Sequence, residues 1–462
     1  MKKEETFEKL VLKIALPVTV QSLLQSSFSV VDQVMIGQLG SGSIAGIGLG
    51  GKFASLYSVV LAAIAAAAGI MISQYMGKRD EKSVSRSFYV NMALSVILAG
   101  IFMALCVLFP QTIMAAYTKD RAAKMLAVKY IRILSISFLP MAVSSIVTTM
   151  LRCMEAATLP LYASIFALVL NTGLNYLLIF GIGIFPSMGV EGAALASVVS
   201  QVLSCVMILI FFIIYKNKQQ MRLKFVRQRR AISQKGISTG KQEENHGEYG
   251  KQYLKILCPL LVCEFLWSLG ENVYTAIYGN IGTDSCAAMT MTIPVQTMVI
   301  GALSGLSQAS GILIGKSLGA GNYKQAYAES KKLLLYGLSA SIILSLLLIV
   351  ASPFYVRIYN VEPEVREITR NLLIVISVVA PVKVLNMILG GGIIRSGGKT
   401  KYSMCIDIIG TWGFGVPLGL LSAFVWELPI VYVYFILSLE ECVRLGISLV
   451  VFRRRGWMER IE

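Results

Sequence analysis

Twelve stretches of predominantly apolar residues run along this chain, and they constrain its fold more than any other feature. A helix that crosses a bilayer needs about 20 such residues. The stretches cover approximately residues 14–36, 50–74, 87–109, 125–149, 160–182, 192–214, 256–279, 290–315, 332–356, 367–391, 403–425 and 430–452. Because lipid offers the backbone no hydrogen-bond partners, segments of this length cross it as helices. We therefore expect an all-α polytopic membrane protein with twelve transmembrane helices.

The composition argues against a soluble enzyme. Only 15% of the 462 residues are charged, against about 25% in soluble domains. The single histidine, His246, argues against histidine-based metal sites. The eight cysteines are scattered, form no C-x-x-C pair and mostly lie within apolar runs, so we expect no disulfide framework. The sequence contains no phosphate-cradling loop and no ATPase domain. We expect no metal site, no cofactor and no enzymatic activity.

The net charge of +17 is explained by topology. If the N-terminus is cytoplasmic, most of the 42 Lys and Arg residues fall in segments on the cytoplasmic side, as the positive-inside rule requires. The longest of these segments, residues 216–255, reads as a flexible linker pinned to anionic lipid. We therefore expect a multi-pass protein of the plasma membrane with both termini in the cytoplasm. Its partners would include membrane lipids and exclude nucleic acid.

The two halves of the chain repeat each other. Shifted by 242 residues, AGIMISQYMG (68–77) meets SGILIGKSLG (310–319), and further along Arg152 meets Arg395 with the offset increased by one. An offset of six spans makes the halves parallel, related by an axis along the membrane normal. We expect an N-terminal six-helix lobe (1–215), a cytoplasmic linker (216–250) and a C-terminal six-helix lobe (251–462). Two similar lobes that enclose a cavity and rock against each other are typical of a transporter.

A polar stripe crosses the first span. Gln25 and Asp32 belong to it, together with Gln21 and Ser29, at steps of four, four and three residues that place them on one helix face. An ionisable group inside a membrane is a functional candidate by default, so Asp32 is predicted to bind an ion or a proton. The alternative is a carboxylate held in a structural hydrogen-bond network.

Two asparagines in the fifth span extend this prediction. Asn171 and Asn175 are four residues apart and share a helix face. Amides near a carboxylate can coordinate a cation or hold the acid in position, so the three residues are candidates for ion or proton coupling. Intramembrane asparagine can also act simply as a contact between helices.

The seventh span carries two acids beside aromatic residues. Glu264 and Glu271 lie two turns apart, and Tyr274 follows on the same segment at the repeat position of Asp32. Carboxylates next to aromatic rings suit an organic cation through charge and cation–π attraction. These residues and Gln25 are predicted to line the substrate cavity, although Glu271 lies near the outer end and could simply be solvated.

Asp407 in the eleventh span is a further candidate for the cavity. Lys383 in the tenth span could be its counter-ion. In the twelfth span, Glu440 and Arg444 are spaced for an ion pair within one helix. The candidate cavity residues therefore include three or four acids against Lys52 and Lys383, and this balance favours cationic cargo.

Several motifs, in order along nearly the whole chain, resemble the multidrug and toxic compound extrusion (MATE) family. They are VVDQVMIGQLG, GIMISQYMGKRD, R-x-x-E-A-A-T, N-x-G-L-N-Y-x-L-I-F-G, MGVEGAALAS, EFLWSLGENVYTAIYGNIG and GGGIIRSGGKT. The resemblance implies two six-helix lobes and export of cationic amphipathic compounds in exchange for protons or sodium ions. The family's first-span acid corresponds to Asp32 and its fifth-span asparagine pair to Asn171 and Asn175. Its seventh-span acid corresponds loosely to Glu264.

The chain departs from the family pattern in the tenth span. Where some members carry an acid there, this sequence has Lys383 and Asn386, which shifts the expected ion site to Asp32. The coupling ion would be a proton, or sodium bound transiently near Asp32. We expect a monomer that exports small organic cations. The alternative within the same superfamily is a flippase for a lipid-linked saccharide, whose cavity would need several basic residues.

Overall fold

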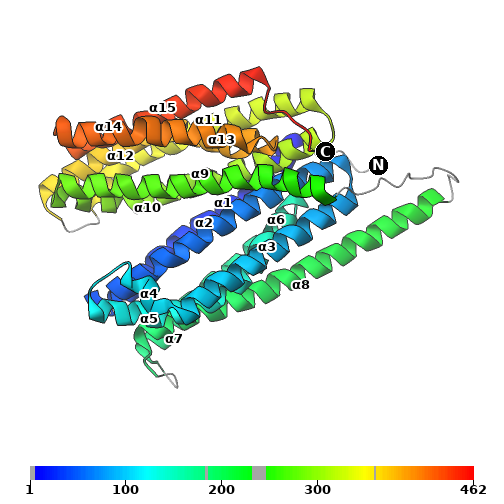
Figure 1. Ribbon diagram of the computed structural model, residues 1–462. Helices are drawn as coiled ribbons and strands as arrows, with labels where there is room; N and C mark the ends of the chain where they lie inside the picture. The colour runs from blue at the N-terminus through cyan, green and yellow to red at the C-terminus, as the bar shows by residue number, and fades with distance from the viewer. Residues whose placement is uncertain (1–5, 183–185, 232–245, 358–360, 462) are drawn as a thin grey trace.

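The computed structural model describes residues 6–182, 186–231, 246–357 and 361–461. These residues form helices joined by short connections, in two bundles (Figure 1). The first bundle contains α1 (Phe7–Gly37), α2 (Ser41–Lys78), α3 (Glu81–Leu108), α4 (Pro110–Ala115), α5 (Arg121–Leu134), η1 (Ser135–Ser137), α6 (Phe138–Cys153), α7 (Thr158–Phe180) and α8 (Gly189–Ala231). The second contains α9 (His246–Ile281), α10 (Thr283–Gly319), α11 (Tyr323–Arg357), α12 (Pro363–Asn386), η2 (Met387–Ile394), α13 (Thr400–Asp407), η3 (Ile408–Gly415), α14 (Val416–Leu420), η4 (Leu421–Val425) and α15 (Ile430–Arg454).

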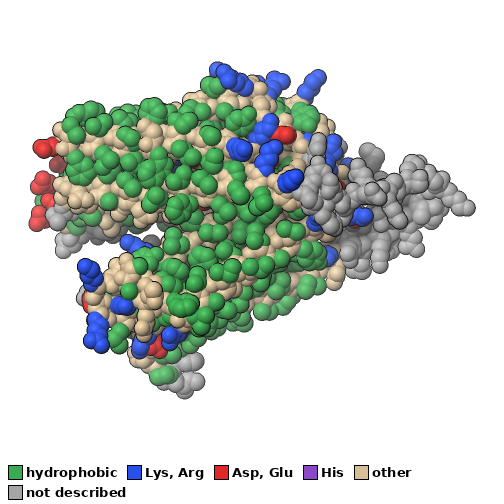
Figure 2. All heavy atoms as spheres, viewed as in Figure 1, with side chains coloured by type: hydrophobic (Ala, Val, Ile, Leu, Met, Phe, Trp, Pro, Cys, Tyr) green, Lys and Arg blue, Asp and Glu red, His purple; other side chains and the backbone are tan. Residues whose placement is uncertain are grey.

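Each of the twelve predicted spans falls on one of these helical stretches. The fourth is α5, η1 and α6 in succession, the tenth is α12 and η2, and the eleventh runs from α13 to η4. Ten stretches are long and apolar enough to cross a membrane, as judged from the described residues. The other two spans are α1 and α15, which carry polar residues in their interiors. Hydrophobic side chains cover the middle of both bundles and charged ones gather at the two ends (Figure 2).

The segment predicted as a linker, residues 216–250, is helical at both of its ends. Helix α8 continues to Ala231, and α9 already begins at His246. The extension of α8 reads KNKQQMRLKFVRQRR, which is rich in residues of high helix propensity, so the helix continues beyond its apolar part. Residues 232–245 lie outside the described residues.

The π-helical segments η2 and η3 interrupt two spans in the second bundle. Segment η3 leads directly into Pro417, which has no backbone N–H and cannot satisfy the carbonyl one turn earlier. A local widening of the helix is one way to accommodate such a gap. Segment η2 contains Gly390, Gly391 and Gly392, and two of these line the cavity described below.

The hydrophobic core explains why the two bundles form a V. One buried cluster draws residues from both, including Ile14 and Ile72 from the first and Leu313, Ile394 and Trp457 from the second. Three further clusters each belong to a single bundle. The shared cluster joins the bundles at the end that carries both chain termini, here named the closed end, and they diverge towards the opposite, open end (Figure 1).

Two glycines form a reciprocal contact at the closed end. A Cβ at Gly77 in α2 would overlap the carbonyl oxygen of Lys316 in α10, and a Cβ at Gly319 would overlap that of Gln74. The repeat offset of 242 relates Gly77 to Gly319 and Gln74 to Lys316. The same contact is therefore made twice about the pseudo-two-fold axis, and only glycine allows the two helices to approach this closely.

The C-terminal tail also bridges the bundles at the closed end. Gln74, which is fully buried, donates through Nε2 to the carbonyl oxygens of Ser396 (2.6 Å) and Glu459 (3.2 Å). Its Oε1 accepts from the backbone N–H of Ile461 at 2.7 Å. Because Trp457 in the same tail is fully buried, the tail is part of the core that holds the bundles together.

Candidate functional site

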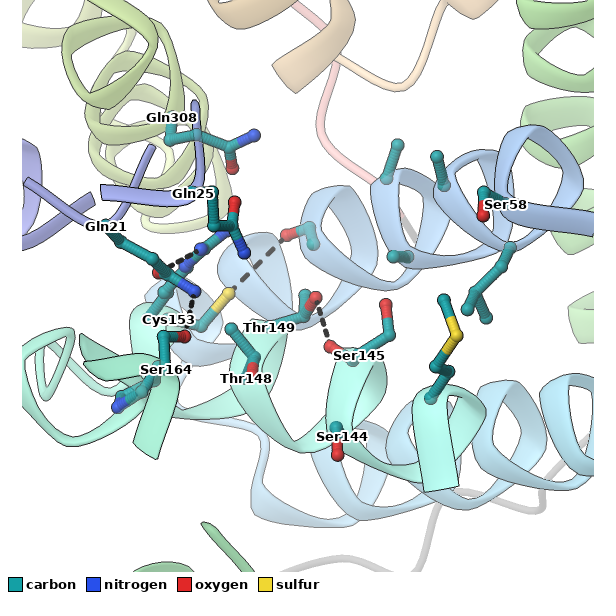
Figure 3. Close-up of a pocket in the computed structure, with 18 of the residues that line it drawn as sticks. Gln21, Gln25, Ser58, Ser144, Ser145, Thr148, Thr149, Cys153, Ser164 and Gln308 are labelled. Carbon is teal, nitrogen blue, oxygen red and sulfur yellow. Dashed lines mark hydrogen bonds between the residues drawn. The ribbon is translucent and has the colours of Figure 1, made fainter. Parts of the chain in front are cut away.

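A cavity of about 640 Å³ lies between the two bundles. Helices α1, α2, α6, α7 and α8 line it from one side, and α9, α10 and the end of η2 line it from the other. Figure 3 shows Gln25 and Gln308, from opposite bundles, directed into this space. Any movement of one bundle against the other would change the shape of the cavity and its access.

Most of the lining is small or uncharged. Apart from its charged residues, the polar lining consists of amides and hydroxyls: Gln21, Gln25, Ser58, Ser144, Ser145, Thr148, Thr149, Ser164, Gln201, Ser204, Ser307 and Gln308. Alanine, glycine and aliphatic side chains provide most of the rest, together with Met141, Cys153 and Pro160. Such a surface can contact an apolar body and still hydrogen-bond its polar substituents, which suits amphipathic molecules of varied shape.

Arg152, at the end of α6, lines the cavity from the first bundle. Its Nη2 donates to Oε1 of Gln21 at 2.9 Å, and Gln21 Nε2 donates in turn to Oγ of Ser164 at 2.7 Å. The nearest acid in sequence, Glu155, is bound instead to Lys316 at 2.5 Å. Within the part of the chain that the structure describes, Arg152 has neutral partners and no carboxylate.

Arg395 occupies the repeat position in the second bundle and also lines the cavity. Its Nη1 donates to Glu264 Oε1 at 3.0 Å, and its Nη2 contacts Cys263 Sγ at 3.1 Å. Asp407 accepts from the Cys263 thiol at 2.6 Å and lies 3.6 Å from Arg395. The two sites share one arrangement, but the second has the carboxylates of Glu264 and Asp407 where the first has Ser22 and Ser164.

Asp32, Asn171 and Asn175 lie together, as their spacing predicted. Asn175 is 3% exposed, and its Nδ2 donates to Asp32 Oδ1 at 3.0 Å. With its amide oriented to satisfy its neighbours, Asn171 donates to Asp32 Oδ2 at 3.1 Å. Ser200 in α8 lies 3.3 Å from the Asn171 amide. Asp32 has no basic partner among the described residues, and the side chain of Ser29 lies outside them.

The cluster around Asp32 is distinct from the cavity. None of the predicted coupling residues Asp32, Asn171 and Asn175 belongs to the described cavity lining. Tyr130 in α5 lies near enough to Asp32 to feel its charge. The cluster joins α1, α7 and α8, whereas Gln21 and Gln25 on the same helix as Asp32 line the cavity. Helix α1 therefore connects the two sites directly.

The predicted cavity residues lie in different surroundings. Gln25 and Glu264 line the cavity, but Glu271, Tyr274 and Asp407 are not part of its described lining. Glu271 is exposed near the open end of α9. Tyr274 is 5% exposed and donates to Glu440 Oε2, so it faces the interior of its own bundle.

The expected partners of Asp407 and Arg444 differ from the observed ones. Asp407 pairs with Arg444 and Arg395, and not with Lys383. Arg444 lies 3.7 Å from Glu441 and forms no ion pair with Glu440 within the described residues. Spacing within one helix permits a pair with Glu440, but Arg444 instead contacts Asp407 on a packed neighbouring helix and Glu441 on its own. These charges neutralise one another inside the second bundle.

The cavity is therefore not acidic, contrary to the balance expected from the sequence. Its charged residues among those described are Arg152, Arg395 and Glu264. Both arginines appeared in the sequence only as markers of the repeat. The signal that could have found them is the repeat itself, because equivalent positions on two facing lobes approach a shared axis.

Removal of the Arg444 charge should destabilise the protein. In Arg444→Gln, Asp407 and the buried Glu441 would lose a shared cation, and breaking a buried pair typically costs about 3–5 kcal/mol. We expect the melting temperature of the purified protein in detergent to fall by several degrees. Arg453→Gln, at an exposed position of the same helix, is the matched control. Equal melting temperatures for the two variants would contradict a stabilising role for the cluster.

Comparison with known proteins gives a consistent set of relatives. A protein-family model described as MatE matches residues 17–177 and 237–421. YisQ of Bacillus subtilis, described as an uncharacterized transporter, is 23% identical over 454 residues, which cover 96% of this chain and 93% of that protein. A probable multidrug resistance protein NorM of Thermotoga maritima is 22% identical over 461 residues, with 99% and 95% covered.

The fold has close counterparts among solved structures. One of them, described as the outward-facing conformation of a multidrug resistance MATE family transporter of the MOP superfamily, matches with a TM-score of 0.84. The sequences are 16% identical, and the match covers 97% of this chain and 95% of the other. At this level of identity the similarity shows a shared fold.

Proposed function

Because this chain belongs to the MATE family of membrane transporters, we propose that it is a secondary antiporter for amphipathic organic compounds that carry a cationic group. Export would be driven by protons or sodium ions that bind at Asp32. The observation that carries this proposal is the arrangement of α1, which places the Asp32 cluster and the wall of the central cavity on one helix. A change at one site can reach the other through a rigid element.

The Asp32 cluster has the chemistry for either ion. A carboxyl group withdrawn from water, with no cation beside it, binds a proton readily, and the amide donors of the two asparagines stabilise it again once it is charged. The cluster also offers oxygens for sodium, including the buried Asn175 Oδ1, which has no hydrogen-bond partner. Cargo class follows from the relatives that are described as multidrug resistance proteins and from the amphipathic lining of the cavity.

Transport would proceed by alternating access. In the described conformation the bundles are joined at the closed end and apart at the open end. Rocking them about the pseudo-two-fold axis would expose the cavity to each side in turn. Ion binding at Asp32 and cargo binding in the cavity would then favour different conformations of α1.

The test is transport of rhodamine 123 into inside-out membrane vesicles, with pH and sodium gradients imposed separately. We expect accumulation of the dye with one of the two gradients and none when that gradient is collapsed. Accumulation that needs neither gradient would contradict secondary antiport. Vesicles without the protein supply the background.

We also propose that the closed end faces the cytoplasm, with the protein in the plasma membrane and acting as a monomer. The tail that carries Arg460 lies at this end, and the connection that carries Lys119 lies at the other. In a background without native cysteines, Lys119→Cys should react with an impermeant maleimide on intact cells. Arg460→Cys should react only after permeabilisation, and the reverse pattern would overturn this orientation.

A further inference from the structure

We propose that the central cavity contains a subsite for an anionic group at Arg152, so that its preferred cargo is zwitterionic, with a carboxylate as well as a cationic centre. This inference rests on the proposed function and specifies the substrate class of the same cavity. Its starting point is Arg152, the one charged residue of the described lining that has no oppositely charged residue beside it.

The two bundles differ at equivalent positions. Gln21 and Cys263 are related by the repeat, as are Ser164 and Asp407 with the offset increased by one. In the first bundle, Gln21 contacts Arg152 and Ser164. In the second, Cys263 contacts Arg395 and Asp407. The repeat position of Glu264, moreover, is Ser22. The first bundle thus keeps the arginine and omits both carboxylates that neutralise it in the second.

The charge of Arg152 is not neutralised from elsewhere. Glu155, on the turn that follows, pairs with Lys316 at 2.5 Å and lies 3.8 Å from Lys13. A guanidinium remains protonated in proteins. Among the described lining residues, Glu264 can cancel the charge of Arg395, and the charge of Arg152 remains. Moreover, the Nε of Arg152 is buried and has no hydrogen-bond partner.

This arrangement favours one ligand chemistry. Arginine presents a planar fork of donors that matches a carboxylate, and Gln21 already holds one side of the fork in place. In the same cavity lining, Ser164 and Thr149 supply hydroxyls, and Ile312 and Leu168 supply apolar surface. A carboxylate on an aromatic or aliphatic body could therefore pair with Arg152 while its body remains in the amphipathic part of the cavity.

Rhodamine 110 and rhodamine 123 test this inference, because they share one cationic ring system. The first has a free carboxylate and the second is its methyl ester. Binding to purified protein is measured by fluorescence polarisation. We expect the wild type to bind rhodamine 110 about tenfold more tightly, as a charge-assisted hydrogen bond would produce. Arg152→Gln should remove this preference, and Arg152→Lys, which keeps the charge but not the fork, should retain part of it.

Two further variants separate local charge from general effects. Lys52→Gln removes the same charge at an exposed position outside the cavity and should leave the preference unchanged. Glu264→Gln removes the acid of the described lining that pairs with Arg395 and should increase the affinity for rhodamine 110. A gain of this kind cannot result from poor folding.

The outcomes distinguish the inference from the proposed function. If the wild type transports rhodamine 123 with a gradient but binds both dyes equally, the anion subsite is wrong and antiport stands. If rhodamine 110 binds in a way that depends on Arg152 but neither dye is transported, the subsite stands and the proposed function is wrong. Failure to bind either dye would overturn both.

Discussion

Replacement of Asp32 with asparagine should abolish gradient-driven transport without unfolding the protein. Asn175 and Asn171 both donate to this carboxylate, and no basic residue neutralises it within the described part of the chain. The asparagine variant keeps the shape of the side chain but has no site for the exchanged proton or the charge that would hold sodium. If ion binding and cargo binding are coupled, each ligand must lower the affinity for the other by the same factor. A variant that cannot bind the ion therefore has no driving force for export.

The measurement is dye accumulation in vesicles at matched expression, together with dye binding to the purified variant. Accumulation should fall to the level of vesicles without the protein, while dye binding is retained. Asn171→Ala should cost less, because it removes one donor and leaves the carboxylate. Glu191→Gln is the matched control, since Glu191 is an acid of α8 that pairs on the surface with Lys129. If Asp32→Asn still concentrates dye, Asp32 is structural.

The architecture followed from the sequence because the membrane limits the choices. A span must be apolar over a length set by the bilayer, so the positions of the helices could be predicted even where η2 and η3 deviate from α-helical geometry. The repeat then predicted two similar lobes. The ends of the spans were harder to place, because helices such as α8 continue beyond the lipid with polar residues of high helix propensity.

The neighbours of Asp32 could be predicted, whereas those of Asp407 could not. Asn171 and Asn175 share one face of a helix within the same lobe, and polar groups in lipid seek each other. For Asp407 the sequence suggested Lys383, whereas the structure pairs it with Arg444 and Arg395. The choice between them depends on how helices are rotated about their axes, which packing decides. Sequence spacing alone contains no information on that rotation.

Alanine at Gly77 or Gly319 should impair transport, because it would force α2 and α10 apart at the closed end. At each position a Cβ would overlap a backbone carbonyl of the opposite helix, which cannot rotate away. Overpacking of this kind costs about 1–3 kcal/mol. The described conformation would then lose population relative to one in which the closed end is open. Since both conformations are needed for a transport cycle, we expect transport to fall roughly 5- to 150-fold, in line with that energy.

The high helix propensity of alanine separates an effect at the contact from an effect within the helix. Alanine favours a helix over glycine by about 1 kcal/mol, so a loss in either variant must arise at the contact and not within the helix. Gly100→Ala in α3 is the matched control, because nothing lies within 4 Å of its Cβ position; it should transport normally.

Labelling of the cavity provides a second measurement. Gln308→Cys, in the cavity lining, should react more slowly with an impermeant maleimide added at the open end when it is combined with either closed-end variant. If Gly77→Ala and Gly319→Ala instead behave like Gly100→Ala, this contact does not form part of the transport cycle. The closed end would then have to be held by the Gln74 contacts to the C-terminal tail.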